Sequence, residues 1–298
     1  MIKNSLKYIL WMFVGMAMMA LLALSCGKDS QKETEEDIKI PELEARVVEV
    51  DSPRMKIYFP PTEGKRCSFC IACPGGGYAG IPGADGYEGA FYKDLFNEAG
   101  YALAVLYYTL PAGDPKKPVA DIENAIKLVR DQADVWYVDK AKVGVMGFSA
   151  GGHLASYAAT HEEGDLRPDF QVLFYPVITM ETNKTHSGSR TNLLGNYPSD
   201  AKLILYSNQF HVSEQTPPAF LAYAKNDTTV PAADNGGVYY DKLVQFGVPV
   251  TRCMYDGNRH GWHWGTYFFD GNTYSDGTKY ENLDDVKEKL LTWLKELE

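Results

Sequence analysis

The chain has 298 residues, of which 45% are hydrophobic and 13% aromatic, and its formal net charge is −10. This length and composition suit one large α/β domain with a full apolar core. The acidic balance argues against nucleic acid and anionic lipid headgroups as partners, because no basic stripe is present to neutralise phosphates.

The first 25 residues are predicted to be a targeting segment. Lys3 and Lys7 precede an apolar run from Tyr8 to Leu24, and Cys26 follows closely. This pattern resembles the signal of a bacterial lipoprotein, so we expect lipidation of Cys26 and a lipid-anchored place in the cell envelope, on an outer-membrane, periplasmic or surface face. An ordinary secretory signal and an N-terminal membrane anchor are the alternatives.

After the signal, residues 26–43 are polar and acidic and are predicted to form a flexible tether. Residues 44–298 are predicted to form a single domain. Strands are expected over residues 46–50, 55–59, 67–73, 102–107, 170–175, 219–224 and 248–255, with another beginning at Val143. Helices are expected over residues 88–99, 118–136, 153–160, 235–246 and 283–297. Alternating strands and helices predict a mostly parallel sheet with helices on both faces.

Three cysteines at three-residue spacing, Cys67, Cys70 and Cys73, invite a metal-site interpretation. They lie in a predicted strand, where side chains alternate between the two faces, so Cys70 points away from the other two. We therefore predict small buried core residues and no metal. A disulfide with Cys253 remains open at this point.

A candidate nucleophile lies in the stretch Gly147-Phe148-Ser149-Ala150-Gly151. The pattern G-x-S-x-G follows a β-prone run and precedes a helix-compatible run, which is the context of a strand–turn–helix nucleophile elbow. Such a turn is strained and needs small residues on both sides of the serine. We predict that Ser149 is the nucleophile; the alternative is a glycine-rich turn that closes a βα unit.

A serine nucleophile needs a base and an orienting acid, which follow it in the chain as acid and then histidine. His260 lies just after a predicted late strand, beside a glycine, and is the predicted base, with His263 as its rival. Asp227 follows the preceding strand and is the predicted acid. Asp234 and Asp256 are alternatives, and Asp227 could instead be a turn cap.

The tetrahedral intermediate of acyl transfer needs amide donors for its oxyanion. Ala150, the residue after the serine, supplies one amide. The stretch Pro74-Gly75-Gly76-Gly77-Tyr78 follows the third predicted strand and supplies the others, because three glycines let the backbone approach a substrate closely.

With these motifs the chain resembles the α/β-hydrolases of the esterase/lipase group that have a glycine-rich oxyanion loop, and in particular bacterial acetyl-xylan-esterase-like lipoproteins. The resemblance covers about residues 44–298. Its matching stretches are residues 73–78, 107–111, 121–134, 145–156, 174–177, 192–195 and 216–220. It implies Ser149, Asp227 and His260 as the catalytic residues. It implies the amides of Gly76, Gly77 and Ala150 as the oxyanion hole.

The resemblance also implies an α/β-hydrolase sheet with a small irregular lid, for which residues 178–215 are the candidate. It places Cys253 several strands away from the other cysteines, which argues against the disulfide. This chain departs from many relatives at Pro74, where a histidine is common, and at Tyr108-Thr109, where Tyr-Arg is usual. Residues 262–281 are longer and more aromatic than expected. Five aromatic side chains there could line a sugar- or aryl-binding rim or else cover the last helix: Trp262, Trp264, Tyr267, Phe268 and Phe269.

The resulting expectation is a serine carboxylesterase that hydrolyses acetyl or other short acyl esters on a carbohydrate such as xylan. It needs no cofactor, and it meets a membrane only through its lipid anchor. A serine peptidase of the same fold is one alternative. The other is a non-catalytic glycan-binding lipoprotein.

Overall fold

The computed structural model describes residues 40–256, 260–261 and 282–297, with side chains from Asp285 onward in the last range. The predicted signal, Cys26 and the first part of the predicted tether lie outside the described residues. The compact unit runs from Ile40 to Glu298. It begins before residue 44 because Leu43 exchanges hydrogen bonds with Thr62, whose backbone N–H donates to the Leu43 carbonyl at 2.9 Å.

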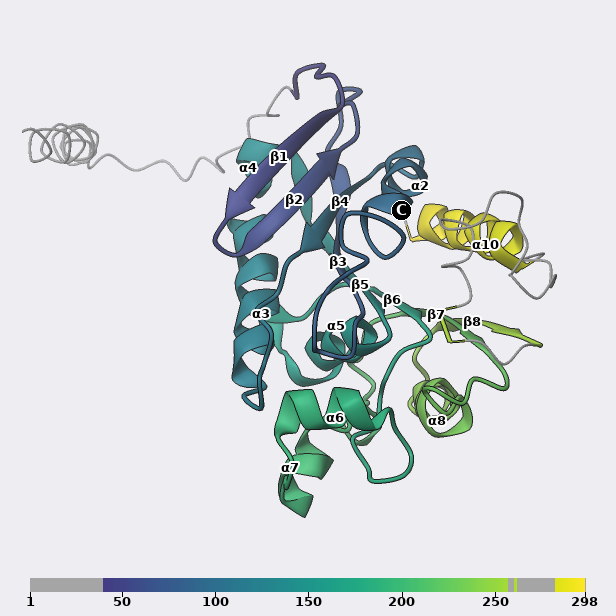
Figure 1. Ribbon diagram of the computed structural model, residues 1–298. Helices are drawn as coiled ribbons and strands as arrows, with labels where there is room; N and C mark the ends of the chain where they lie inside the picture. The colour runs from purple at the N-terminus through teal and green to yellow at the C-terminus, as the bar shows by residue number, and fades with distance from the viewer. Residues whose placement is uncertain (1–39, 257–259, 262–281, 298) are drawn as a thin grey trace, which may run out of the picture. The chain divides into compact units, whose positions relative to one another are not determined.

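Eight strands form a single sheet in the order β1-β2-β4-β3-β5-β6-β7-β8 (Figure 1). The strands are β1 (Arg46–Asp51), β2 (Arg54–Phe59), β3 (Cys67–Cys73), β4 (Tyr101–Leu106), β5 (Val138–Phe148), β6 (Gln171–Phe174), β7 (Ala219–Ala224) and β8 (Val250–Tyr255). Strand β2 runs antiparallel to both of its neighbours, β1 and β4. All the remaining pairs of neighbouring strands, from β4 through β3 and β5 to β8, are parallel. The predicted mostly parallel sheet is confirmed.

Helices cover both faces of the sheet. The α2 helix (Lys93–Glu98) and α10 (Asn282–Glu296) lie side by side on one face, whereas α3 (Lys116–Asp131), α5 (Ala150–His161) and α8 (Val238–Gln245) cover the other (Figure 1). Shorter elements are η1 (Ala90–Tyr92), α4 (Ala133–Trp136), η2 (Gly164–Leu166), α6 (Ser187–Leu194), α7 (Asp200–Leu205), η3 (Asn208–Phe210) and η4 (Ala233–Gly237). None of the helices within the described ranges is both long enough and apolar enough to cross a bilayer.

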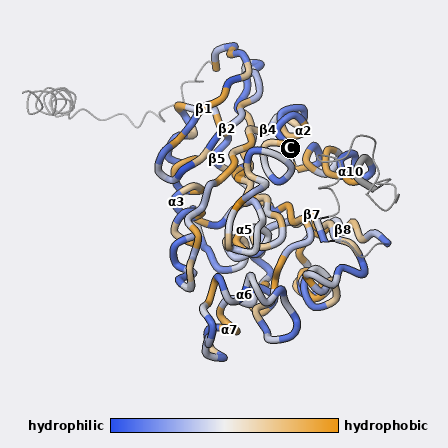
Figure 2. Tube along the Cα trace, viewed as in Figure 1, coloured by the Kyte–Doolittle hydropathy of each residue, from blue (hydrophilic) through white to orange (hydrophobic). Residues whose placement is uncertain are grey.

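The core lies between the sheet and its helices, and the hydrophobic colours of Figure 2 gather along the central strands. All seven residues of β3 are buried, as expected for a strand that is covered on both faces. Its three cysteines and Cys253 are buried free thiols, so the prediction of small core residues is confirmed. Burial raises the pKa of Cys67 to about 11, which keeps this thiol protonated and unreactive at neutral pH.

Three predicted elements differ from the observed ones. Residues 88–99 begin with turns and η1, and α2 starts only at Lys93. The helix predicted over 118–136 breaks at Gln132, and Tyr137, in the left-handed region at φ 59°, ends α4. The helix predicted over 235–246 opens with the π-helical turn η4.

The segment over residues 178–215, which was predicted to be irregular, is partly helical. The segment contains α6 and α7, each capped by a side chain. The His186 imidazole accepts the N–H of Ser189, and the Ser199 hydroxyl accepts that of Lys202. These caps satisfy amides that a short helix leaves without partners, so the helices form without a long apolar stripe.

Candidate active site

Strand β5 ends in the predicted nucleophile elbow. Ser149 has φ 51° and ψ −118°, a conformation that few non-glycine residues adopt, and it directly precedes α5. Its backbone N–H donates to Phe174 at 3.1 Å, and its carbonyl accepts from Val177 at 2.9 Å. These two bonds to the β6 side of the sheet hold the turn in its strained form.

The glycines on either side of the serine are needed because backbone segments approach them closely. A Cβ on Gly147 would lie 2.3 Å from the carbonyl oxygen of Gly151. A Cβ on Gly151 would lie 2.0 Å from the carbonyl oxygen of Cys73, at the end of β3. A side chain at Gly147 would therefore push the end of β5 away from the start of α5, and one at Gly151 would push α5 away from β3.

Three of the predicted residues form one hydrogen-bonded chain. The His260 Nε2 atom lies 2.7 Å from Ser149 Oγ, and its Nδ1 atom lies 2.6 Å from Asp227 Oδ2. Because an ionised carboxylate can only accept, Nδ1 carries the proton and Nε2 is left to accept the serine hydroxyl proton. This tautomer allows the imidazole to act as a base toward Ser149.

Asp227 is held in place by backbone amides. It follows β7 and is 4% exposed. Its second oxygen, Oδ1, accepts the N–H groups of Thr229 at 2.9 Å and Val230 at 3.0 Å. The turn-cap role considered for Asp227 is thus present, and it orients the carboxylate whose other oxygen contacts His260. The alternative acid Asp256 is exposed and lies near Lys225.

His260 follows β8, and the glycine beside it is required by the backbone. Gly261 has φ 63°, in the left-handed region. The aromatic ring of Tyr175 packs edge-on against the imidazole, with ring centroids 4.9 Å apart. His263, the rival base, and the five aromatics of the predicted rim lie outside the described residues. Of the sequence's other histidines, His153 is buried and bonded to Tyr78 and the Tyr206 carbonyl.

The glycine-rich loop after β3 has two amides available for an oxyanion. The Gly75 N–H is taken up by the Glu88 carboxylate at 2.6 Å. Gly76 and Gly77 follow, with φ 122° and 64°, and within the described part of the chain no acceptor bonds to their N–H groups. Ala150 is the first residue of α5, so its amide has no carbonyl partner one turn earlier. These are the three predicted donors.

Helix α6 contacts this loop from the segment that was predicted to be irregular. The Asn192 side chain donates to the Gly77 carbonyl at 2.9 Å. The His186 ring also lies against Gly77, since a Cβ there would be 3.4 Å from His186 Cε1. Burial, together with the nearness of His260, lowers the pKa of His186, while Asp227 opposes the shift. His186 therefore lies in the same electrostatic environment as the three bonded residues.

Within the described residues, no group of three or more His, Cys, Asp and Glu side chains could hold a metal ion.

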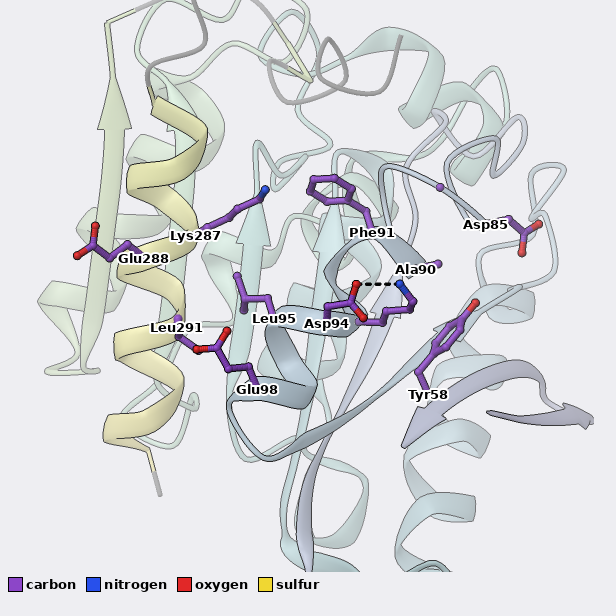
Figure 3. Close-up of a pocket in the computed structure, with 12 residues that line it drawn as sticks. Tyr58, Asp85, Ala90, Phe91, Asp94, Leu95, Glu98, Lys287, Glu288 and Leu291 are labelled. Atoms are coloured by element: carbon purple, nitrogen blue, oxygen red, sulfur yellow. Dashed lines mark hydrogen bonds and ion pairs between the residues drawn. The ribbon is translucent and has the colours of Figure 1, made fainter. Parts of the chain in front are cut away.

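A groove of about 820 Å³ lies apart from the site, between the η1–α2 segment and α10. Figure 3 shows Lys287 reaching toward Phe91 across this groove, with Nζ 4.7 Å from the ring centroid. Ser149, Asp227 and His260 do not line it.

Four residues near the site were not predicted from the sequence: Glu88, Tyr175, His186 and Asn192. Tyr175 and Asn192 belong to stretches that match the resembled family, which is the one signal that could have marked them. Glu88 lies in a predicted helix, where a glutamate is ordinarily exposed, and His186 lies in the segment with little periodicity. Neither carries a pattern that points to the site.

Comparison with known proteins identifies the family of the chain. The BD-FAE family model matches residues 55–239. An acetylxylan esterase of Xylanibacter ruminicola is 39% identical over 230 residues, which cover 76% of this chain and 45% of the relative. The endo-1,4-beta-xylanase B of Butyrivibrio fibrisolvens is 31% identical over 205 residues, covering 64% of this chain and 32% of the relative. The chain thus spans less than half the length of these two curated relatives.

Solved structures show the same fold. The acetyl ester-xyloside bifunctional hydrolase of Caldicellulosiruptor lactoaceticus superposes with a TM-score of 0.71 at 28% identity, over 82% of this chain and 88% of that one. A carboxylesterase of Lactobacillus plantarum superposes with a TM-score of 0.66 at 24% identity, over 85% of this chain and 97% of that one. The α/β-hydrolase fold expected from the sequence is confirmed.

Proposed function

Because the chain belongs to the BD-FAE family of α/β-hydrolases, we propose that it is a serine carboxylesterase that removes acetyl groups from xylan or a related plant or host glycan. The observation that carries this proposal is the hydrogen-bonded chain from Ser149 through His260 to Asp227. The acetylxylan esterase relative and the acetyl ester-xyloside hydrolase structure support the choice of acyl group and sugar.

In the proposed reaction, Ser149 Oγ attacks the ester carbonyl carbon and His260 Nε2 takes the serine proton. The carbonyl oxygen becomes an oxyanion, which the amides of Gly76, Gly77 and Ala150 stabilise. The C–O bond to the sugar then breaks, and His260 returns the proton to the leaving sugar oxygen. Water then attacks the acyl carbonyl carbon while His260 Nε2 takes its proton. The second tetrahedral intermediate breaks at its bond to Ser149 Oγ, His260 returns the proton to Oγ, and acetate and the free serine are released.

The role of Asp227 in this scheme is electrostatic and geometric. The Oδ2 atom holds the imidazole with its proton on Nδ1, and its charge stabilises the imidazolium that forms in both steps. The two backbone amides on Oδ1 keep the carboxylate from rotating away.

The proposal is tested by measuring acetate release from acetylated xylan and ferulate release from feruloylated xylan, with short-chain aryl esters for comparison. Ser149→Ala is the control for each substrate. Acetate release that depends on Ser149 supports the proposal. Preference for feruloylated xylan would replace the acetyl assignment with a hydroxycinnamoyl one, and hydrolysis of an aminoacyl-proline anilide in place of esters would favour the peptidase alternative.

The non-catalytic alternative is addressed by labelling with a fluorophosphonate, which reacts with an activated serine. The strained conformation of Ser149 and the bonded His260 favour a reactive serine, because a binding protein has no need of either. A wild-type protein that resists labelling and releases no acid from any of these esters would be a binding protein on a hydrolase scaffold.

We also propose that the protein is lipid-anchored at Cys26 in the bacterial cell envelope, on the basis of the sequence pattern before this cysteine. Metabolic labelling with a palmitate analogue tests this: the wild-type chain should carry the label and Cys26→Ser should not. An unlabelled wild-type chain that fractionates as a free secreted protein would support an ordinary secretory signal.

A further inference from the structure

A buried carboxylate with no assigned role lies next to the proposed active site. Glu88 is 0% exposed and is placed between the oxyanion loop and the end of β6. Its Oε2 atom accepts the Gly75 N–H at 2.6 Å, and its Oε1 atom accepts the Tyr175 hydroxyl at 3.0 Å. Burying a carboxylate costs free energy unless its oxygens are hydrogen-bonded, so the two contacts of Glu88 indicate a structural role beside the active site.

The first contact pins the start of the oxyanion loop. A Cβ on Gly75 would lie 2.8 Å from Glu88 Oε2 and 3.0 Å from the Phe148 carbonyl, so only glycine lets the backbone come this close. Since Gly75 donates to Glu88, its amide faces away from the oxyanion position. The next two amides, of Gly76 and Gly77, are the ones left for the substrate.

The second contact reaches the base. Tyr175 is buried, has φ 36°, and follows β6 directly. Its hydroxyl is held by Glu88, and its ring meets the His260 ring at an interplanar angle of 72°. An edge-to-face contact of this kind restricts rotation of the imidazole about its own axis. Glu88 therefore contacts the oxyanion loop directly and the base through one side chain.

We propose that Glu88 is a positioning residue that holds the oxyanion loop and, through Tyr175, the imidazole of His260 in register with each other. This inference rests on the proposed esterase function. The oxyanion amides and the His260 imidazole act on the same ester carbonyl. The amides must lie close to its oxygen, and the imidazole must lie close to the serine that attacks its carbon. Misplacement by about 1 Å can lower a rate on the order of 10²-fold, so a shared anchor has a direct effect on turnover.

Three variants of the full-length protein test the proposal. Glu88→Met removes both bonds, and we expect kcat for p-nitrophenyl acetate to fall on the order of 10²-fold with little change in KM. Tyr175→Phe removes only the second bond and should lower kcat about tenfold. Glu88→Gln keeps an oxygen for Gly75 and an amide for the tyrosine hydroxyl, so it should retain kcat within about threefold.

Tyr239→Phe is the matched control, because its hydroxyl is also buried and bonds to Gln171 at 2.9 Å, away from the reacting groups. It should lower the melting temperature as Tyr175→Phe does, yet leave kcat within about twofold of wild type. The proposal is overturned if Tyr175→Phe and Glu88→Met keep wild-type kcat, or if their losses appear in KM alone. Equal kcat losses in Tyr239→Phe and Tyr175→Phe would also overturn it, since the effect would then be general destabilisation.

A second readout separates this inference from the proposed function. The Nδ1 proton of His260, held against Asp227, should give a downfield NMR signal whose position depends on the orientation of the ring. Tyr175→Phe should shift or broaden this signal, and Tyr239→Phe should not. An inactive wild type would overturn the esterase function, whereas an unchanged signal in Tyr175→Phe and Glu88→Met would overturn the role of Glu88.

Discussion

The Asn192 side-chain amide donates a hydrogen bond to the carbonyl oxygen of Gly77 at 2.9 Å, across 115 positions of sequence. This bond joins α6 to the loop that holds the proposed oxyanion amides. The backbone of the same residue is also engaged, because its carbonyl accepts the Gly113 N–H at 2.8 Å. The segment over 178–215 is thus part of the framework of the site.

From this bond we predict that Asn192→Ala lowers kcat for aryl acetates about tenfold, because the Gly77 peptide loses its fixed orientation and the adjacent amide donors move. The matched control is Lys202→Ala, which removes bonds from the same segment to the Leu194 and Gly113 carbonyls and leaves the glycine loop untouched. Steady-state kinetics of both variants decide the matter. Equal activities would show that α6 contributes stability alone.

The bonded chain of Ser149, His260 and Asp227 predicts how far kcat falls when the acid or the nucleophile is replaced. Asp227→Asn should lower kcat on the order of 10⁴-fold, because an amide can present an N–H to Nδ1 and favour the wrong imidazole tautomer. Ser149→Ala should lower it on the order of 10⁵-fold or more. Release of p-nitrophenol measures both; a nearly fully active Ser149→Ala would exclude this serine as nucleophile.

The choice of base is tested by two histidine variants. His260→Ala should abolish fluorophosphonate labelling of Ser149, because His260 Nε2 lies 2.7 Å from the serine oxygen. His263→Ala should retain labelling and esterase activity. The opposite pattern, with His263 essential and His260 dispensable, would contradict the assignment.

Much of the site could be predicted because its residues carry local signals. The elbow serine has glycines at fixed spacing, and Asp227 and His260 each follow a late strand. In a parallel sheet the carboxyl ends of strands meet at one edge, so β5, β7 and β8 bring these three loops together. Strands β3, β4, β6 and β7 could be predicted because buried parallel strands are continuous apolar runs.

The contacts of Glu88 and Asn192 could not be predicted, because no local pattern specifies a partner for either side chain and Asn192 is marked only by its place in a family-matching stretch. A glutamate in an amphipathic stretch ordinarily faces water, and only the close approach of Gly75 and Tyr175 gives Glu88 its bonds. Helices α6 and α7 are short and stabilised by caps and tertiary contacts, which a search for apolar periodicity does not detect. In this protein, long-range contacts determine the details that local pattern leaves open.

The close packing at the elbow predicts a steric effect. Gly151→Ala should destabilise the fold by about 2 kcal/mol or more and inactivate the protein, because the new methyl would overlap the carbonyl of Cys73 at the end of β3. Gly80→Ala is the control, since a Cβ there meets only Pro82 Cδ at 3.9 Å. Urea denaturation and ester hydrolysis test both; a Gly151→Ala variant as stable and active as Gly80→Ala would mean that β3 and the elbow are not packed this closely.

The buried His153 predicts how stability depends on pH. Its Nε2 atom donates to the Tyr206 carbonyl at 2.7 Å and its Nδ1 atom accepts the Tyr78 hydroxyl at 2.9 Å, an arrangement that requires the neutral ring. Burial lowers its pKa from 6.5 to about 4, a shift opposed by the bond to Tyr206 and increased by the charge of His161. Above pH 6.5 the ring is neutral in the folded and the unfolded chain and adds no pH dependence.

As pH falls from 6.5 toward 4, the unfolded chain takes up a proton at His153 that the folded chain does not. The free energy of unfolding should therefore fall by about 1.4 kcal/mol per pH unit on account of this group and level off below its folded pKa. Because burial also lowers the pKa of His161 to about 4, the wild-type slope should be steeper than that for one group. His153→Gln can still donate to Tyr206 and accept from Tyr78. In this variant the slope of the unfolding free energy against pH should be smaller by about 1.4 kcal/mol per pH unit, the contribution of one titrating group. Urea denaturation at intervals between pH 7.5 and 4.5 measures it, and a slope equal to that of wild type would show that His153 is protonated in the folded protein as readily as in the unfolded chain.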